Sequence, residues 1–175
     1  MSDTTATPTR YVTYEQLTPK QRMVLDAAEK NMELAYSPYS HFRVGASLLA
    51  KDGRVFPGCN IENANYTNTQ HGETTAIANA YAQGVREFWA MAIIARGETF
   101  DTEVPTPSCG YCRQSLYEAA QVSGNDIELI ISNTMKTKVL IISVHELLQG
   151  AFGPLDLGID VSKYRTLKRS GESEI

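Results

Sequence analysis

The segment FWAMAIIA, residues 88–95, constrains the fold of this chain more than any other stretch, because it is apolar throughout. A half-exposed strand alternates apolar with polar side chains, whereas a strand of this composition is typical of a sheet covered on both faces. The run is also far shorter than the roughly 20 residues that cross a bilayer. It therefore predicts a buried strand with a layer of structure on each side.

The flanking segments predict the elements of these layers. Apolar residues at helical spacing, including Leu34, follow a Thr18 N-cap and Pro19, and this helix is expected to end at Ser37–Pro38. The expected elements are this helix, strands at 43–50 and 54–60 joined by a hairpin turn at Asp52–Gly53, a helix at 71–83, a strand at 88–95, a helix at 109–120, strands at 126–131 and 137–142, and a short helix opened by a capping box from Ser143 to Glu146.

This order predicts an α/β three-layer sandwich, in which a mixed five-stranded sheet has helices on both faces. The strand–helix–strand alternation favours parallel pairing, and the hairpin favours an antiparallel edge. The 175 residues fit one domain, which we expect to span residues 11–167. Residues 1–10 are rich in Ser, Thr and Pro and predict a disordered tail, and residues 168–175 predict a frayed one.

Charge and cysteine content narrow the functional classes. The formal net charge of −4 disfavours a basic groove for nucleic acid and a polybasic membrane anchor. The N-terminal segment lacks the apolar core of a secretory signal. The three cysteines contain one C-x-x-C pair, which indicates a metal or redox site in a reducing compartment rather than a disulfide framework. We therefore expect a cytoplasmic protein without nucleic-acid or membrane partners.

The C-x-x-C pair, Cys109 and Cys112, has several interpretations. It falls at an expected helix start, where free amide groups and the helix dipole favour thiolates. A redox pair is more typical of a thioredoxin-like unit near the N-terminus. Cys59 and His71 could complete a four-ligand structural zinc site, although a small buried residue in a strand is the simpler interpretation of Cys59. His71, Cys109 and Cys112 alone would leave one position on zinc for water, as in catalytic sites.

His71 and Glu73 acquire a specific meaning only together with the cysteines. Taken singly, His71 is an ordinary polar residue and Glu73 a solvated glutamate in the first turn of a helix. Combined, the residues form H-x-E followed by C-x-x-C, the signature of zinc nucleobase deaminases. Cys109 follows His71 by 38 positions, which accommodates the predicted helix, strand and loop. Glu73 would then carry protons beside a metal-bound water.

Three stretches carry a resemblance to a known family: YSPYSHFRVGASLLAKDGRVFPGCNIENANY at 36–66, CGYCRQ at 109–114 and HELLQGAF at 145–152. They resemble the cytidine deaminases, in particular the small homotetrameric type. The resemblance implies a mixed sheet between helices and one Zn²⁺ per subunit, held by His71, Cys109 and Cys112. It implies hydrolytic deamination of cytidine or deoxycytidine to the uridine product and ammonia, in pyrimidine salvage. Glu73 would take a proton from the metal-bound water and deliver it to N3 and then to the leaving amine.

The same resemblance implies the substrate contacts. Asn60 and Glu62 match residues that bind the ribose hydroxyls, and the Gly72 amide matches a contact to the pyrimidine carbonyl. The aromatic contacts that it implies are Phe42 in the base pocket, Tyr66 over the sugar and Phe152 across a subunit interface, with core packing as the alternative for each. The expected assembly is a homotetramer, with a homodimer as the alternative.

The chain departs from the family pattern at three positions. Small homotetrameric members usually have cysteine in place of His71 and arginine in place of Thr74. Three thiolates give the zinc site a charge of −1 that an arginine offsets, whereas one imidazole and two thiolates leave it neutral. We hypothesise that Thr74 replaced the arginine because His71 removed this charge. The family also usually has proline directly before the first C-x-x-C cysteine, where this chain has Pro107–Ser108, at the end of an extended loop.

These departures leave other functions open. One alternative is a deaminase of a modified, N4-substituted or antibiotic-like cytosine nucleoside. A non-catalytic, zinc-stabilised binding module is another, but it gives no role to Glu73, Asn60 or Glu62. A nucleic-acid-editing deaminase is disfavoured by the acidic charge. The other histidines, His41 and His145, are interpreted as surface or packing residues.

Overall fold

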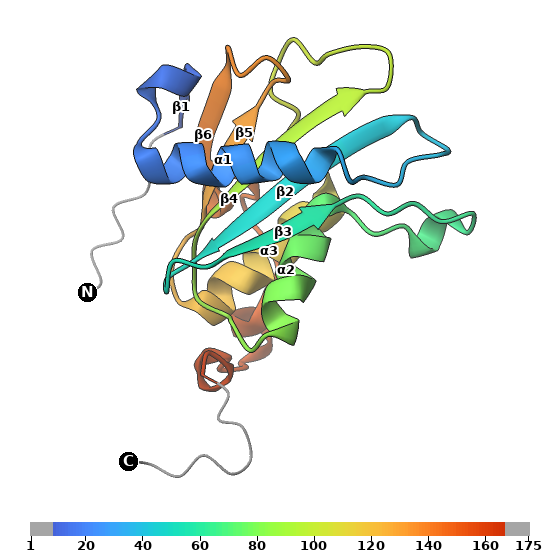
Figure 1. The fold of residues 1–175 in the computed structure, drawn as a ribbon. Helices are drawn as coiled ribbons and strands as arrows, with labels where there is room; N and C mark the ends of the chain where they lie inside the picture. The colour runs from blue at the N-terminus through green and yellow to red at the C-terminus, as the bar shows by residue number, and fades with distance from the viewer. Residues whose placement is uncertain (1–8, 167–175) are drawn as a thin grey trace.

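The computed structural model describes residues 9–166, which form a sheet covered by helices on both faces (Figure 1). The strands are β1 (Arg10–Val12), β2 (Phe42–Ala50), β3 (Val55–Cys59), β4 (Phe88–Gly97), β5 (Glu128–Ser132) and β6 (Val139–Ser143). The α-helices are α1 (Pro19–Met32), α2 (Gly72–Ala82), α3 (Gly110–Ser123) and α4 (Val144–Leu147), and short 3₁₀ turns include η2 (Tyr66–Asn68) and η4 (Ser162–Tyr164). No helix in this part of the chain has the length and apolar character needed to span a membrane.

The sheet is mixed, with the strand order β1-β6-β5-β4-β2-β3. Strand β4 pairs parallel with β5 and antiparallel with β2, and the hairpin of β2 and β3 forms one edge. Gly53 in the hairpin turn has a φ of 90°, in the left-handed region that glycine adopts without strain. The predicted hairpin, its edge position and the parallel pairing are confirmed.

The sheet has six strands, whereas the sequence predicted five. The additional strand, β1, has only three residues and pairs antiparallel with β6. A strand this short carries no readable alternation, and its partner β6 is the last strand within residues 9–166. Because Arg10 begins β1, the prediction of a disordered tail through residue 10 is wrong at that residue. The other residues of the two predicted tails are 1–9 and 168–175. Of these, only Thr9 lies within the described residues.

The side chains of β4 alternate between the two covering layers, as a strand buried on both faces requires. Met91 and Ile93 pack in the cluster with α2 and α3, whereas Ala92 and Ile94 pack in the cluster with α1. Figure 1 shows α1 crossing one face of the sheet, with α2 and α3 on the other. Trp89 is the exception in this run, with 51% of its surface exposed. The predicted three-layer sandwich is confirmed.

Two glycines bring helices into close contact with opposite faces of the sheet. A Cβ atom on Gly45 would lie 2.0 Å from the carbonyl oxygen of Ala28 in α1. A Cβ atom on Gly58 would lie 2.2 Å from the carbonyl oxygen of Gly72, the first residue of α2. Because non-bonded heavy atoms pack at about 3.5–4.0 Å, neither site has room for a side chain. The start of α2 therefore lies directly against β3.

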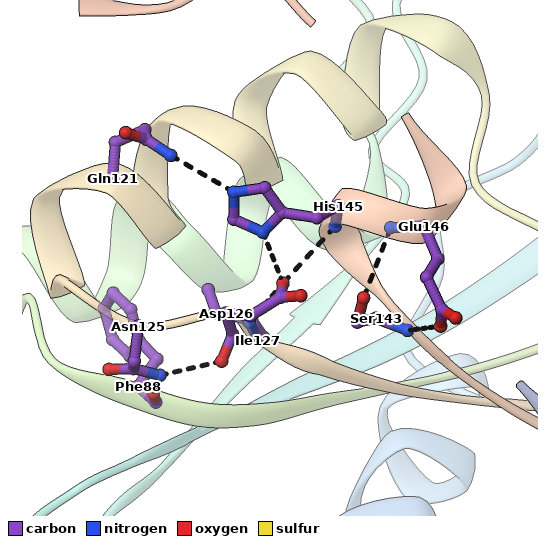
Figure 2. A network of polar contacts seen from close by, with 8 residues as sticks. All are labelled: Phe88, Gln121, Asn125, Asp126, Ile127, Ser143, His145 and Glu146. Atoms are coloured by element: carbon purple, nitrogen blue, oxygen red, sulfur yellow. Dashed lines mark hydrogen bonds and ion pairs between the residues drawn. The ribbon is translucent and has the colours of Figure 1, made fainter. Parts of the chain in front are cut away.

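Two predicted helix starts are confirmed by their capping boxes. The Thr18 hydroxyl accepts a hydrogen bond from the Gln21 amide at 3.3 Å, and the Gln21 side chain accepts one from the Thr18 amide at 2.9 Å. Figure 2 shows the equivalent pair at α4, where Ser143 and Glu146 exchange two hydrogen bonds of 3.2 Å. Each box satisfies amide groups that have no partner within the helix.

The first helix ends earlier than predicted. It stops at Met32 rather than near Ser37–Pro38, and Leu34 is 74% exposed. The amide of Tyr36 instead donates to the carbonyl oxygen of Asn60 at 3.0 Å. The chain leaves the helix to pair with the segment after β3, a long-range contact that helical spacing does not reveal.

The packing role expected of His145 is visible in Figure 2. Its Nδ1 lies 2.9 Å from a carboxylate oxygen of Asp126, and its Nε2 lies 3.3 Å from the side-chain nitrogen of Gln121 in α3. The neighbouring Asn125 donates to the carbonyl oxygen of Phe88 at 2.9 Å. These contacts tie α4 and α3 to the turn that leads into β5.

Candidate active site

Helices α2 and α3 begin close together, and their first residues carry the two halves of the predicted zinc motif. His71 immediately precedes α2, Cys109 immediately precedes α3, and Cys112 lies in the first turn of α3. The Nδ1 atom of His71 lies 3.4 Å from Sγ of Cys109 and 3.3 Å from Sγ of Cys112. All three potential ligand atoms lie within 4.8 Å of one another. The structure thus brings the three predicted ligands to one point.

The chemistry of this donor set fits zinc. One imidazole and two thiolates form a known type of catalytic zinc site, in which the fourth position holds water or substrate. Burial raises the pKa of the Cys112 thiol, and the nearby Glu73 and Cys109 raise it further. A divalent cation bound here would offset the negative charges of Glu73 and the cysteines, and it would hold the Cys112 sulfur as a thiolate. His71, Cys109 and Cys112 therefore suit a Zn²⁺ ion.

Cys59 does not complete a fourth ligand position. It lies in β3 opposite Gly45 and is half-buried, and burial raises the pKa of its thiol. Within residues 9–166, the only group of three or more potential ligands is His71 with Cys109 and Cys112. The interpretation of Cys59 as a small strand residue is confirmed, although it is half-buried rather than fully buried. The four-ligand structural site is excluded.

Glu73 is buried next to the potential ligands. It lies in the first turn of α2 and is only 4% exposed. The alternative of a solvated first-turn glutamate is therefore wrong. Its carboxylate lies close enough to Cys112 to raise the pKa of that thiol by its charge and by a hydrogen bond. A buried carboxylate beside a metal site is placed to exchange protons with a water on the metal.

Comparison with known proteins identifies the family. The sequence matches the "Cytidine and deoxycytidylate deaminase zinc-binding region" over residues 18–123. It is 42% identical over 137 residues to the cytidine deaminase of Halalkalibacterium halodurans, an alignment covering 78% of this chain and 97% of that protein. It is 36% identical over 124 residues to a cytidine deaminase of Mycobacterium tuberculosis, covering 70% of this chain and 82% of that protein. The chain belongs to the cytidine deaminase family.

The fold agrees with this membership. The crystal structure of a cytidine deaminase from Burkholderia pseudomallei superposes with a TM-score of 0.68 at 36% identity, covering 78% of this chain and all of that chain. The mixed sheet between helices is therefore the fold of the family. Zinc is the cofactor, since the matched region is a zinc-binding one and contains His71, Cys109 and Cys112.

In this member of the cytidine deaminase family, the Asn60 side chain is already hydrogen-bonded to the protein backbone. The residue is only 8% exposed. Its side-chain oxygen accepts from the Val44 amide at 2.8 Å, and its side-chain nitrogen donates to the Phe42 carbonyl oxygen at 2.9 Å. These bonds hold the segment after β3 against β2. One N–H and one lone pair of the amide remain for a ligand.

Glu62 is held by backbone amide groups. Its Oε2 atom accepts hydrogen bonds from Tyr39 at 2.9 Å and from Ser40 at 3.2 Å. Burial raises the pKa of Glu62, but the hydrogen bonds from Ser40 and Tyr39 outweigh it, so that the pKa lies below its ordinary value. The side chain is therefore an ionised acceptor at neutral pH, with lone pairs left for hydroxyl donors.

The three predicted aromatic contacts differ in exposure. Tyr66 is 72% exposed and meets Tyr39 edge-on, with ring centroids 5.8 Å apart. Phe152 is 60% exposed. Core packing, the alternative for both, is therefore wrong. Phe42 is half-buried, with its ring centroid 6.2 Å from that of Phe100 in the extended loop.

The structure adds two residues of CGYCRQ that the sequence analysis did not assign. Arg113 donates to the carbonyl oxygen of Ser108 at 2.7 Å and to that of Leu147 at 3.4 Å. Gln114 donates to the carbonyl oxygen of Phe152 at 2.8 Å. These bonds hold the loop before Cys109 and the segment after α4 against α3. Their only signal in the sequence is adjacency to the cysteines.

Tyr111, between the two cysteines, was also unassigned. Its ring meets the His71 ring edge-on, with centroids 5.4 Å apart and an interplanar angle of 69°. Because the contact joins two segments far apart in the chain, only the tertiary structure reveals it.

Proposed function

We propose that the protein catalyses the hydrolytic deamination of cytidine and deoxycytidine to uridine and deoxyuridine, with release of ammonia, in pyrimidine salvage. The observation that carries this proposal is the convergence of His71, Cys109 and Cys112 with the buried Glu73 beside them. A zinc-stabilised binding module needs the three ligands but gives no role to a buried carboxylate, whereas deaminase chemistry requires one.

Proton transfer is the role of Glu73. Zinc, when bound, lowers the pKa of a coordinated water to about 7. The Glu73 carboxylate would accept one proton from the attacking water and deliver it to N3 of the pyrimidine, and would then transfer the second proton, from the hydroxyl now on C4, to the amine that leaves C4. The water oxygen becomes the new carbonyl oxygen, and the nitrogen leaves as ammonia. Burial of Glu73 strengthens its electrostatic interactions with the reacting atoms.

The remaining predicted residues position the nucleoside. Gly72 is the first residue of α2, so its amide has no acceptor within the helix and can donate to the pyrimidine carbonyl. Glu62 accepts hydrogen bonds from the ribose hydroxyls, assisted by the remaining capacity of the Asn60 amide. Phe42 lines the base pocket, and Tyr66 covers the sugar.

The proposal includes the assembly and its location. We infer a homotetramer, with a homodimer as the alternative, in which each chain is one catalytic domain and Phe152 reaches across an interface. The 60% exposure of the Phe152 ring supports a contact with another subunit. A cytoplasmic location suits the exposed Cys109, which a reducing compartment keeps available for zinc.

An absorbance assay on cytidine, with zinc content measured on the same sample, tests this function. Glu73→Gln should retain zinc and lower kcat by about 10²–10⁴-fold, the usual contribution of a general acid–base. Glu118→Gln, at an exposed carboxylate of α3, is the matched control and should keep full activity. Full activity of Glu73→Gln would refute the assignment of Glu73. Zinc-bound wild type without turnover would favour the binding module.

Ser108 favours one second candidate, a deaminase of an N4-substituted cytosine nucleoside. Its hydroxyl is buried and has no hydrogen-bond partner within residues 9–166, at the position where the family usually has proline. Comparison of kcat/KM on cytidine, deoxycytidine and N4-methylcytidine separates the two functions. A preference for the methylated substrate would favour this candidate.

A further inference from the structure

The backbone and the ring of His71 are held by separate sets of contacts. The His71 carbonyl oxygen accepts hydrogen bonds from the Thr75 amide at 2.9 Å, the Thr74 hydroxyl at 3.0 Å and the Thr75 hydroxyl at 2.8 Å. These bonds anchor the backbone at the start of α2. They leave the side-chain torsions free, so the orientation of the imidazole must come from contacts of the ring itself.

Zinc-bound histidines usually donate their second ring nitrogen to a carboxylate or a backbone carbonyl, which fixes the ring plane. In His71 the Nδ1 atom faces the two sulfurs, so this second nitrogen is Nε2. Within the described residues, His71 Nε2 has no hydrogen-bond partner in the protein. The usual orienting bond is therefore not supplied by this part of the chain.

The Tyr111 side chain contacts the His71 imidazole, which lacks this orienting hydrogen bond. The two rings meet edge-on at a centroid distance of 5.4 Å, a geometry that aromatic pairs favour. Tyr111 lies in the first turn of α3 between Cys109 and Cys112, so its ring moves with the two sulfurs. It is 60% exposed, which shows that it is not a core residue kept for packing under the sheet.

We propose that Tyr111 is a positioning residue for the zinc site, which holds the His71 imidazole so that Nδ1 points to the metal. This inference rests on the proposed function, because it assumes the zinc site of the deaminase. It concerns the chain's own departure from the family, since a cysteine in place of His71 would have no ring to orient. An edge-to-face pair corresponds to about a two- to tenfold change in an equilibrium constant.

The test compares Tyr111→Ala with Tyr111→Phe. Zinc affinity is measured by competition with a chromophoric chelator, and ligand geometry by the absorption spectrum of the Co²⁺-substituted protein. Tyr111→Ala should bind zinc about two- to tenfold more weakly and shift the Co²⁺ bands. Tyr111→Phe keeps the ring and should retain wild-type zinc affinity. Tyr164→Ala, which removes a half-exposed ring outside the site, is the control for loss of an aromatic surface.

A double-mutant cycle with His71→Cys decides whether Tyr111 acts through the imidazole. In the His71→Cys background, Tyr111→Ala should leave zinc affinity unchanged, because no ring remains to be oriented. Equal losses in both backgrounds, or no loss in the wild-type background, would overturn the proposal. Failure of the proposed function would give a different result. The coupling between Tyr111 and His71 in zinc affinity would still be observed, but the wild-type protein would not deaminate cytidine.

Discussion

Gly58→Ala is expected to displace the N-terminal end of α2 from the sheet. The added Cβ would lie 2.2 Å from the Gly72 carbonyl oxygen and 2.5 Å from the Ala76 amide nitrogen. Relief of this overlap requires a shift of about 1 Å, since non-bonded atoms pack at about 3.5–4.0 Å. The backbone of Gly58 does not have a positive φ, so the effect is steric rather than conformational.

The expected losses of stability, turnover and zinc affinity follow from the residues at the start of α2. Overpacking of this kind costs about 1–3 kcal/mol, which lowers Tm by about 2–12 °C for a chain of this length. A displacement of about 1 Å at a reacting group lowers turnover by as much as about 10²-fold. Because His71 and Glu73 lie at the displaced end, we expect Gly58→Ala to lower kcat and zinc affinity as well as Tm.

Gly45→Ala provides the matched control. Its Cβ would lie 2.0 Å from the Ala28 carbonyl oxygen and 2.6 Å from the Met32 amide nitrogen, on the face covered by α1. It should lower Tm by a similar amount and leave zinc affinity close to wild type. Thermal unfolding, chelator competition and cytidine turnover on both variants make the comparison. Equal loss of zinc affinity and kcat in the two variants, or unchanged values in Gly58→Ala, would refute the positional reasoning.

Two further predictions concern charge at the site. His71→Cys alone should lower kcat/KM because the third thiolate adds negative charge to the zinc site. The further change Thr74→Arg should restore part of the lost kcat/KM. Strictly additive effects of the two changes in the double-mutant comparison would refute the charge hypothesis. Glu62→Gln should raise KM for cytidine more than it lowers kcat, because it removes a charged acceptor for the ribose. Burial raises the pKa of Glu62, but hydrogen bonds from Ser40 and Tyr39 lower it overall. The carboxylate is therefore ionised at any pH above its ordinary pKa of about 4.3, and its contribution to ribose binding is lost only as the pH falls below that value. The KM difference between wild type and Glu62→Gln should thus be constant between pH 6 and pH 8, measured by steady-state kinetics; a difference that varies across this range would contradict the assignment.

Local patterns predicted much of the fold and the site. The apolar run of β4 indicated a strand covered on both faces, and the capping residues Thr18 and Ser143 marked two helix starts. Such features depend on near neighbours in the chain, whose chemistry is legible in one dimension. The spacing of His71 and Glu73 from the C-x-x-C pair likewise indicated a metal site, because few residue types bind zinc.

Only the tertiary structure decided the features that depend on distant segments. It excluded Cys59 from the ligand group, buried Glu73, and turned the Asn60 amide toward β2. It also placed the Tyr111 ring against His71. Residue type determines what a side chain can bind, and the sequence is sufficient for that. Which partner it meets depends on how helices and strands far apart in the chain pack together, and the close approach of α2 to Gly58 is an example that no local pattern encodes.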